Sequence, residues 1–290
     1  MKIIVTGGLG FIGSRFANLC LEKGHDVKII DKITYAANVH RLSSSFTSNQ
    51  RLALDICDVT EEDIKGYDCI VNFAAETHVD NSIKDGRPFI RSNIEGVFNL
   101  LEISRKVGIK KFIQISTDEV YGDIELGESK ETDNLNPSSY YSASKAAADM
   151  LILAAHRTYG LNYIITRTCN NYGPKQHPEK FIPKIKENTL NGKEVPLYKP
   201  GTQIREWIHV DDNCESIYNI MLSDQINEIF NIGSGERYSN AEVVKVVEPN
   251  AQIKLVKDRL GHDKRYALNT EKYDTVFGIT NKHNFYEYYR

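Results

Sequence analysis

The stretch KIIVTGGLGFIG, residues 2–13, places a short β-branched run directly before Gly7, Gly10 and Gly13 in a GxxGxxG spacing. The run predicts a buried strand, and the amphipathic residues 11–24 predict a helix. Glycines between a strand and a helix let the backbone turn tightly and approach a pyrophosphate, whose charge the helix N-terminus stabilises. The stretch therefore predicts a dinucleotide-binding turn, the alternative being a tight turn with a structural role only.

Strand and helix patterns then alternate through the first two thirds of the chain. Apolar runs predict further strands near 26–31, 51–57, 69–75, 111–116, 162–168 and 228–234, and two long segments, 89–108 and 138–160, predict helices. This alternation predicts a doubly wound parallel α/β sheet of the Rossmann type. We expect residues 1–172 to form the dinucleotide-binding domain. Residues 173–290 should form mainly a smaller substrate-binding lobe, interleaved because segments near 204–233 complete the sheet.

The composition is that of an ordinary globular protein, with 290 residues, 41% hydrophobic residues and a formal net charge of −3. This charge gives no reason to expect nucleic acid or an anionic membrane as a partner. No apolar run approaches the roughly 18 residues of a membrane span, and the first run is too short for a signal peptide. The five cysteines form no CxxC pair, which predicts free thiols and a cytoplasmic protein. We expect no metal site, because no His/Cys/Asp cluster has ligand spacing.

The second predicted strand ends at Asp31, 18 residues after Gly13. An Asp at this place can accept hydrogen bonds from a ribose diol, and it repels a 2′-phosphate. The pattern therefore favours NAD over NADP, while the adjacent Lys32 weakens that preference.

Tyr141 and Lys145 form a YxxxK pair within the predicted helix 138–160. Residues four apart share a helix face, and a lysine ammonium near a phenol lowers its pKa by roughly 1–3 units. Tyr141 could then act as a base toward a sugar hydroxyl. Tyr140 is the adjacent alternative, but it lies five residues from Lys145 and off the shared face.

Residues 116–123, STDEVYGD, place the adjacent acids Asp118 and Glu119 behind Thr117, where the predicted strand 111–116 ends. Acids avoid the edge of a core unless a partner or a chemical role holds them there. Two carboxyls in unlike surroundings have separated pKa values, so that one is ionised while its neighbour is protonated. The alternative is that the two acids only cap the following turn.

Four stretches together, TGGLGFIG, STDEVYGD, YSASK and NNYGP, resemble the extended short-chain dehydrogenases/reductases. Within that family they are most similar to the nucleotide-sugar 4,6-dehydratases, above all those that act on dTDP-glucose. Matching segments run from Met1 to about Asn269. The Thr-Asp-Glu triplet is the most specific of them, since related 4-epimerases lack the acid pair and uronate decarboxylases as a rule carry Ser-Glu there.

The resemblance implies a lyase that uses NAD and a nucleotide sugar. Tyr141 would take the proton of the hexose O4 while NAD takes the C4 hydride, which makes the C5 proton acidic. Glu119 would remove that proton, and Asp118 would protonate the departing O6 hydroxyl. The hydride then adds to C6 and Glu119 returns a proton to C5, while Thr117 hydrogen-bonds the C4 oxygen.

The resemblance also assigns binding residues. On the cofactor side they are Gly7, Gly10, Phe11, Ile12, Gly13, Asp31, Lys32, Thr34, Asp55, Ile56, Phe73, Ala74, Ala75, Ser92, Tyr141, Lys145 and Asn171. On the substrate side they are Glu76, Thr77, Thr117, Asn170, Lys180, Phe181, Pro196, Tyr198, Arg205, Asn240, Arg259 and His262. Arginine suits a pyrophosphate because its guanidinium donates two parallel hydrogen bonds. His78 and His209 are interpreted as structural histidines.

Other functions stay open at this point. UDP-glucose is the alternative to dTDP-glucose as substrate. A nucleotide-sugar 4-epimerase or decarboxylase is the second possible function, and an NAD-binding sensor without catalysis is the third. The acid pair argues against the second, and the intact catalytic set argues against the third. Leu260, where the family usually has proline, and a trimmed C-terminal region leave the nucleotide and the sugar open. The family commonly forms homodimers through two long helices, here 90–107 and 140–159.

Overall fold

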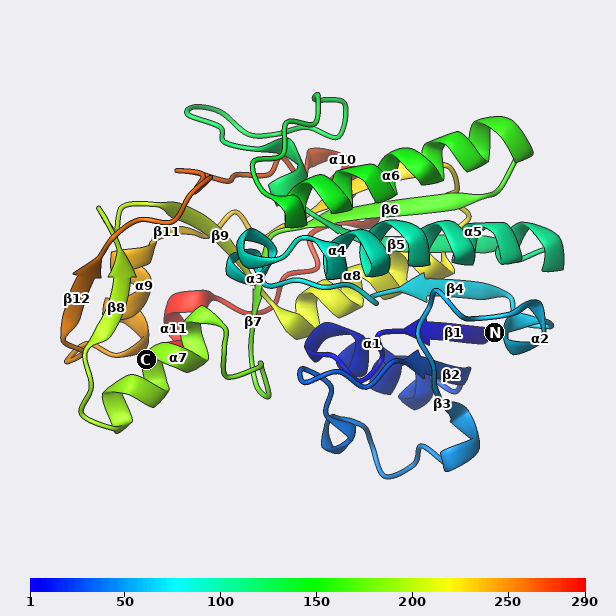
Figure 1. Cartoon of the computed structure of the whole chain (residues 1–290), viewed down its shortest axis with the longest axis horizontal. Coiled ribbons are helices and arrows are strands. Elements are labelled where there is room, and N and C mark those ends of the chain that lie inside the picture. The colour runs from blue at the N-terminus through cyan, green and yellow to red at the C-terminus, as the bar shows by residue number, and fades with distance from the viewer.

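A seven-stranded parallel sheet forms the centre of the computed structural model, which describes residues 1–290 (Figure 1). The strand order is β10-β6-β5-β4-β1-β2-β3. The strands are β1 (Lys2–Thr6), β2 (Asp26–Asp31), β3 (Arg51–Ala53), β4 (Cys69–Asn72), β5 (Lys111–Thr117), β6 (Tyr163–Thr168) and β10 (Glu228–Ile232). Strand order reverses at β1, where open sheets of this type bind ligands. The predicted doubly wound parallel sheet is confirmed.

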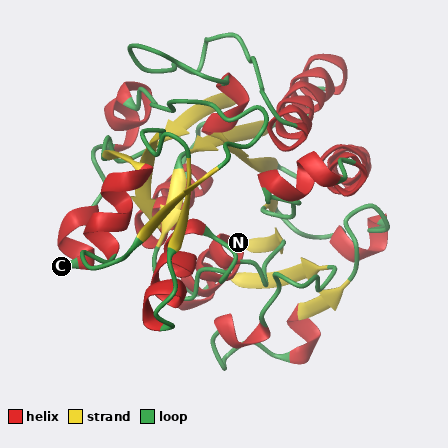
Figure 2. Ribbon diagram, turned by 60° about the vertical axis from the view of Figure 1, so that its left-hand side comes forward, coloured by secondary structure: helices red, strands yellow, loops and turns green.

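Helices cover both faces of the sheet (Figure 2). On one face, α1 (Phe11–Glu22) packs against α8 (Val210–Leu222) over a core that includes Phe16, Ile113 and Ile217. On the other, α5 (Gly96–Val107) packs against α6 (Tyr140–Tyr159) over a second core. The shorter elements between them are α2 (Glu61–Ile64), α3 (Val79–Lys84) and the 3-10 turns η1 (Val39–Arg41), η2 (Ser48–Gln50) and η4 (Asp118–Tyr121).

The two predicted long helices form, with one difference. Ser139 caps α6 by accepting a hydrogen bond from the Ser142 N–H at 3.1 Å, and α6 ends at Gly160 with φ 73°. The segment predicted as one helix over 89–108 begins with α4 (Arg87–Ile90) and passes through the π-helical turn η3 (Arg91–Glu95) before α5. This wider turn carries Ser92 into a cavity described below.

The second lobe has its own small sheets and core. A three-stranded sheet has the order β11-β9-β7, and β12 pairs with β8. The elements are β7 (Asn170–Tyr172), β8 (Val195–Tyr198), β9 (Ile204–His209), β11 (Arg237–Ser239), β12 (Ile253–Val256), α7 (Phe181–Leu190), α9 (Asn240–Val247), α10 (Glu271–Phe277) and α11 (Phe285–Tyr289). Tyr172, Trp207 and Phe285 lie in the core of this lobe.

Two sequence expectations differ from the structure. Of the segments near 204–233, β10 joins the main sheet, but β9 pairs with β7 and β11, because Trp207 of β9 belongs to the core of the second lobe. The strand predicted over 51–57 ends at Ala53, because the Asp55 carboxylate accepts the Cys57 N–H at 3.0 Å and closes a turn. No helix in the chain is both long and apolar enough to cross a membrane.

Candidate active site

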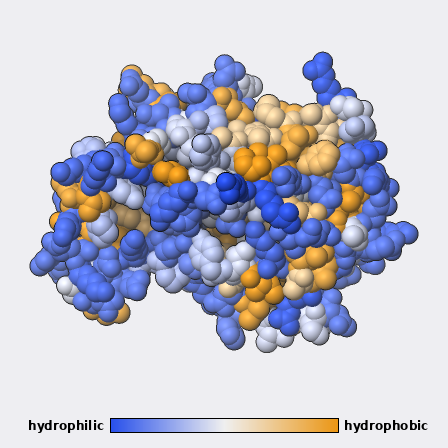
Figure 3. Space-filling model, in the orientation of Figure 1, coloured by the Kyte–Doolittle hydropathy of each residue, from blue (hydrophilic) through white to orange (hydrophobic).

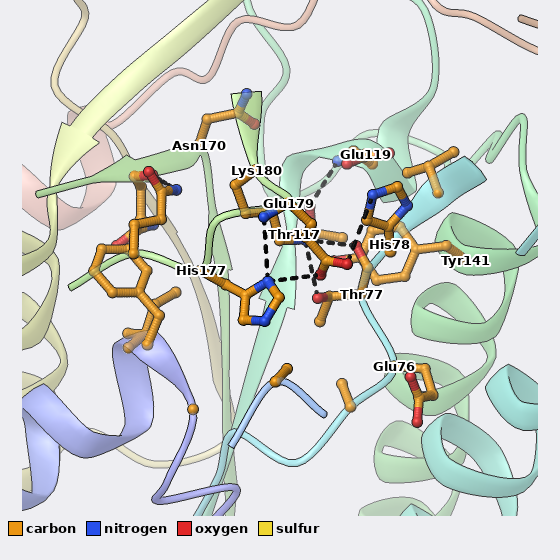
Figure 4. Close-up of a pocket in the computed structure, with 18 of the residues that line it drawn as sticks. Glu76, Thr77, His78, Thr117, Glu119, Tyr141, Asn170, His177, Glu179 and Lys180 are labelled. Carbon is orange, nitrogen blue, oxygen red and sulfur yellow. Dashed lines mark hydrogen bonds and ion pairs between the residues drawn. The ribbon is translucent and has the colours of Figure 1, made fainter. Parts of the chain in front are cut away.

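A cavity of about 660 Å³ lies at the carboxyl ends of the main-sheet strands and extends to the second lobe (Figure 4). The main sheet contributes the segments that follow β1, β2, β3, β4, β5 and β6, and the second lobe contributes residues of β7, α7, β8 and β9. All the residues that the sequence assigned to catalysis, cofactor or substrate line this cavity except Asp118.

The glycine turn brings backbone to the cavity where no side chain would fit. Gly7 has φ +64°, and a Cβ on it would lie 2.6 Å from the Ala74 nitrogen. A Cβ on Gly13 would collide with the Gly7 carbonyl oxygen. Gly10 is the N-cap of α1, so the unpaired N–H groups of the first helical turn lie beside the cavity. This cradle fits a pyrophosphate.

The next strand end carries the residues expected to distinguish NAD from NADP. Asp31 is buried, and its carboxylate accepts the Leu9 N–H at 3.0 Å and the Ile33 N–H at 2.8 Å. Each oxygen keeps a second lone pair for a ligand. Lys32 Nζ lies 3.0 Å from Glu76 Oε1 and donates to Ser92 Oγ at 2.7 Å. Glu76, expected on the substrate side, therefore lies beside Lys32 and partly neutralises it.

Thr117, at the end of β5, organises the acid pair. Its hydroxyl donates to Asp118 Oδ1 at 3.0 Å and accepts the Glu119 N–H at 3.2 Å. The side chain that caps η4 is thus Thr117, and the alternative in which the acids serve as caps does not describe this turn. Asp118 is buried behind Thr117, and its Oδ2 has no hydrogen-bond partner.

The two carboxyls have unlike surroundings. Burial, and then the charge of Glu119, raise the pKa of Asp118 well above its usual value. Burial also raises the pKa of Glu119, but the guanidinium groups of Arg259 and Arg205 oppose that shift. Asp118 therefore favours the protonated form more strongly than its neighbour does, which is the division that an acid and a base require.

Tyr141 and Lys145 both line the cavity, but they do not form the pair that their spacing suggests. Lys145 Nζ donates to the Ile115 carbonyl oxygen at 2.6 Å. Burial lowers the pKa of Lys145 to about 8. Burial, followed by the charge of Glu119, raises the pKa of Tyr141, while a hydrogen bond with Thr117 opposes the shift. Tyr140 is exposed, in agreement with its position off the shared face.

The substrate side of the cavity is rich in charged groups. Lys180 Nζ donates to Thr77 Oγ1 at 3.2 Å, as Figure 4 shows. The buried Arg205 donates to the Asp263 carbonyl oxygen at 2.8 Å and lies over the Tyr266 ring at 4.3 Å. It is therefore not a solvated surface arginine. Phe181, Pro196, Asn240 and His262 complete this side.

Sequence reasoning missed several residues that line the cavity. Asp80 accepts the Tyr198 hydroxyl at 3.0 Å and lies 3.6 Å from the Arg259 guanidinium. His78, interpreted as structural, also lines the cavity, 3.9 Å from Glu179. The sequence could have indicated these residues by their position, because His78 and Asp80 come shortly after Thr77 and Glu179 directly precedes Lys180. The others include Ser116, Thr168, Cys169, Gln176, His177, Leu197 and Trp207.

A cluster outside the cavity has donor atoms within 4.8 Å of one another: His209, Asp211 and His283. The sequence gave no sign of it, because His283 comes from the distant C-terminal segment. Several of its donors already have partners, although the buried Nε2 of His209 has none. Arg15 Nη2 donates to Asp211 at 2.8 Å, His283 Nδ1 bonds Asp212 at 2.9 Å, and His209 Nδ1 accepts the Asp211 N–H at 3.2 Å. We assign no metal to this cluster.

The model of the family described as "NAD dependent epimerase/dehydratase family" matches residues 3–233. The chain belongs to this family. The resemblance inferred from the four sequence stretches is thereby confirmed. Proteins similar to the chain also carry the more specific name dTDP-glucose 4,6-dehydratase. A dTDP-glucose 4,6-dehydratase from Streptomyces niveus is 41% identical over 295 residues, which cover 97% of this chain and 88% of that protein.

Two further comparisons extend the family assignment. The low-salt glycan biosynthesis protein Agl12 of Haloferax volcanii is 43% identical over 282 residues, which cover 94% of this chain and 91% of that protein. The crystal structure of DesIV, a dTDP-glucose 4,6-dehydratase from Streptomyces venezuelae with NAD bound, is 39% identical and superposes with a TM-score of 0.95. The match covers 99% of this chain and 94% of DesIV.

Proposed function

We propose that this protein is a lyase that converts dTDP-glucose to its 4-keto-6-deoxy derivative with NAD as cofactor. The observation that carries the proposal is the acid pair: Asp118 and Glu119 differ in burial and in neighbouring charge, and Thr117 links them beside Tyr141. Relatives about 40% identical over nearly the whole chain bear the name dTDP-glucose 4,6-dehydratase, which supports this nucleotide over UDP.

The cavity fits NAD at its glycine-lined end. The turn at Gly7 and Gly13 has no room for a Cβ and leaves backbone free to approach a pyrophosphate. Asp31 would accept hydrogen bonds from a ribose diol, and Asp55 and Ile56 lie where an adenine would follow. When bound, NAD would supply a hydride acceptor for C4 and a hydride donor for C6.

The residues around Thr117 would then handle the protons. Tyr141 takes the O4 proton, once a bound positive charge has lowered its raised pKa. Glu119, which the arginines help to keep ionised, removes the C5 proton and later returns one there. Asp118 keeps the proton needed by the departing O6 hydroxyl. Because Asp118 does not line the cavity, its proton would pass through the Thr117 hydroxyl, which would give its own proton to O6 as it takes the proton of Asp118.

The other readings lack a comparable observation. A 4-epimerase or a decarboxylase needs no buried, protonatable Asp118 beside Glu119. An NAD-binding sensor has no use for an acid pair beside Tyr141. For the substrate, Arg259 and Arg205 would receive the pyrophosphate of the nucleotide sugar, since both line the cavity near Glu119.

A substrate panel tests the proposed function. The purified protein is incubated with dTDP-, UDP-, GDP- and CDP-glucose, with and without added NAD. Mass spectrometry then measures the mass of the product. We expect loss of one water from dTDP-glucose. Loss of water from UDP-glucose alone would correct the nucleotide, and no loss from any of the four, with NAD bound, would refute the reaction.

We further propose that the protein is a cytoplasmic homodimer that buries α5 and α6. Figure 3 shows an apolar area over these helices, and Phe98, Met150 and Tyr159 are 55%, 48% and 56% exposed there. Exposed apolar patches of this kind mark interfaces between proteins. Sedimentation should give a dimer, and Phe98→Glu with Met150→Glu should give a monomer. A wild-type monomer at working concentration would count against the proposal.

The cytoplasmic location is supported by the five free cysteines, which fit a reducing compartment.

A further inference from the structure

Helix α6 carries a third ionisable side chain that no step of the proposed reaction uses. Tyr141, Lys145 and Asp149 follow one another at intervals of four residues, so they lie along one face of the helix. All three are buried, and Asp149 has no exposed surface at all. A carboxyl group with no access to water needs a positive partner, because an isolated buried charge is very costly.

Arg167 on β6 satisfies only part of that need. Its Nε donates to Asp149 Oδ2 at 3.1 Å, and its Nη1 donates to the Tyr121 hydroxyl at 3.0 Å. Asp149 Oδ1 and Ser116 Oγ on β5 form no hydrogen bond of good geometry, although the Ser116 hydroxyl lies close enough to Asp149 to lower its pKa. A carboxylate accepts more than one hydrogen bond at each oxygen. Asp149 therefore has unused capacity to stabilise a second positive charge, and Lys145 lies one helical turn away.

Lys145 in turn has few other means of keeping its charge. Its ammonium is buried and donates to one carbonyl oxygen, that of Ile115. Burial disfavours the charged form, and the carboxylate of Asp149 is the group that opposes this effect. A neutral lysine could not stabilise a phenolate at Tyr141.

The remaining charges around Lys145 do not substitute for Asp149. On the neighbouring elements the charged groups are Arg167 of β6 and Lys111 of β5, which have the wrong sign, and Asp118 and Glu119 of η4, neither of which acts on the pKa of Lys145. Burial raises the pKa of Asp149 as well, but the charges of Arg167 and Lys145 oppose that shift. β5 presents the Ile115 carbonyl and Ser116. On the helical segments that pack against α6, Asp80 pairs with Arg259 and Glu102 pairs with Arg105, while Lys84, Arg87, Arg91 and Glu95 are exposed.

We propose that Asp149 is a positioning residue that holds Lys145 in its ammonium form beside Tyr141, with Arg167 keeping Asp149 ionised in turn. The buried charged groups Lys145, Asp149 and Arg167 thus follow one another from the cavity along α6 to β6. The inference rests on the proposed function, because it gives Lys145 a role next to a catalytic tyrosine. Asp149 itself touches neither the cavity nor a substrate.

The test measures the pKa of Lys145 directly in the full-length protein. The carbon-13 signal of Lys145 Cε, assigned by its loss in Lys145→Arg, is followed through a pH titration. We expect Asp149→Asn, which keeps the shape and removes the charge, to lower the pKa by about 1 unit or more. The high-pH limb of kcat should move down by the same amount. If Asp149→Asn does not fold, Asp149→Ser carries the same expectation.

Asp149→Glu is the matched control, because it keeps the charge and disturbs the packing. It should hold the Lys145 pKa near the wild-type value even if it lowers the melting temperature. An unchanged pKa in Asp149→Asn, or an equal fall in both variants, would overturn the proposal. The NMR result does not depend on turnover. A wild-type protein that fails to dehydrate dTDP-glucose would refute the proposed function alone.

Discussion

The Thr117 hydroxyl donates a hydrogen bond to Asp118 Oδ1 at 3.0 Å and, at the same time, lies on the wall of the cavity that Asp118 does not reach. This relationship makes Thr117 the contact between a buried acid and any bound sugar. Thr117→Val keeps the shape and removes the hydroxyl. We expect dehydration to fall by about 10²-fold or more, measured as water loss from dTDP-glucose, while NAD content stays unchanged. Thr117→Ser should keep most of the activity, and equal loss in both variants would contradict the role of the hydroxyl.

Glu119→Gln separates the first chemical step from the second. The amide has the same shape as the carboxylate but cannot remove the C5 proton. We expect elimination to stop while some bound NAD is still reduced on addition of dTDP-glucose, because Tyr141 remains in place. The check is NADH absorbance in a single turnover beside mass spectrometry of the sugar. Undiminished water loss would show that another group is the base.

Asp118 should reduce stability at neutral pH, because the fold raises its pKa. The unfolded carboxyl has a pKa of about 3.9. A raised folded pKa means that the stability contributed by Asp118 is full below about pH 3.9 and is lost as pH rises through the folded pKa. Asp118→Asn has no such loss, so we expect it to be more stable than the wild type near pH 7.

Thermal melting of both proteins between pH 4 and pH 8 checks this expectation, since the advantage of Asp118→Asn should shrink toward pH 4. The exposed Asp26→Asn is the control and should show no comparable trend. An advantage that stays constant with pH would mean that packing, and not titration, is responsible.

Gly7→Ala tests the backbone cradle. The added Cβ would meet the Ala74 backbone nitrogen at 2.6 Å, and the residue has φ +64°. We expect NAD affinity to fall by about tenfold or more and stability to fall by about 1–3 kcal/mol. Gly24→Ala is the matched control, because Gly24 has φ +81° but no atom near its missing Cβ. Calorimetry should show normal NAD binding in the control. Normal NAD binding in Gly7→Ala would contradict the assignment of this turn to the pyrophosphate of NAD.

Much of the fold was predictable because its signals are local. Apolar runs, helix caps such as Ser139 and Gly160, and glycines with positive φ act over a few residues. The lining of the cavity was predictable for a related reason: the motifs sit at strand ends, and the carboxyl ends of parallel strands meet at one edge. The place of β9 was not predictable, because its apolar residues Trp207 and Ile208 pack into different cores, and the neighbours that decide the pairing are far away in the sequence.

The sequence by itself determined the strand–glycine–helix turn, the alternation of strands and helices along the chain and the chemical types gathered at the site. The tertiary structure decided how those groups are paired. Spacing placed Lys145 with Tyr141, but Lys145 donates a hydrogen bond to the Ile115 carbonyl of β5, and Asp149 accepts one from Arg167 of β6. The raised pKa of Asp118 likewise follows from burial. Charge and hydrogen-bond energies depend on distance and on access to water, and both are set by segments far apart in the chain.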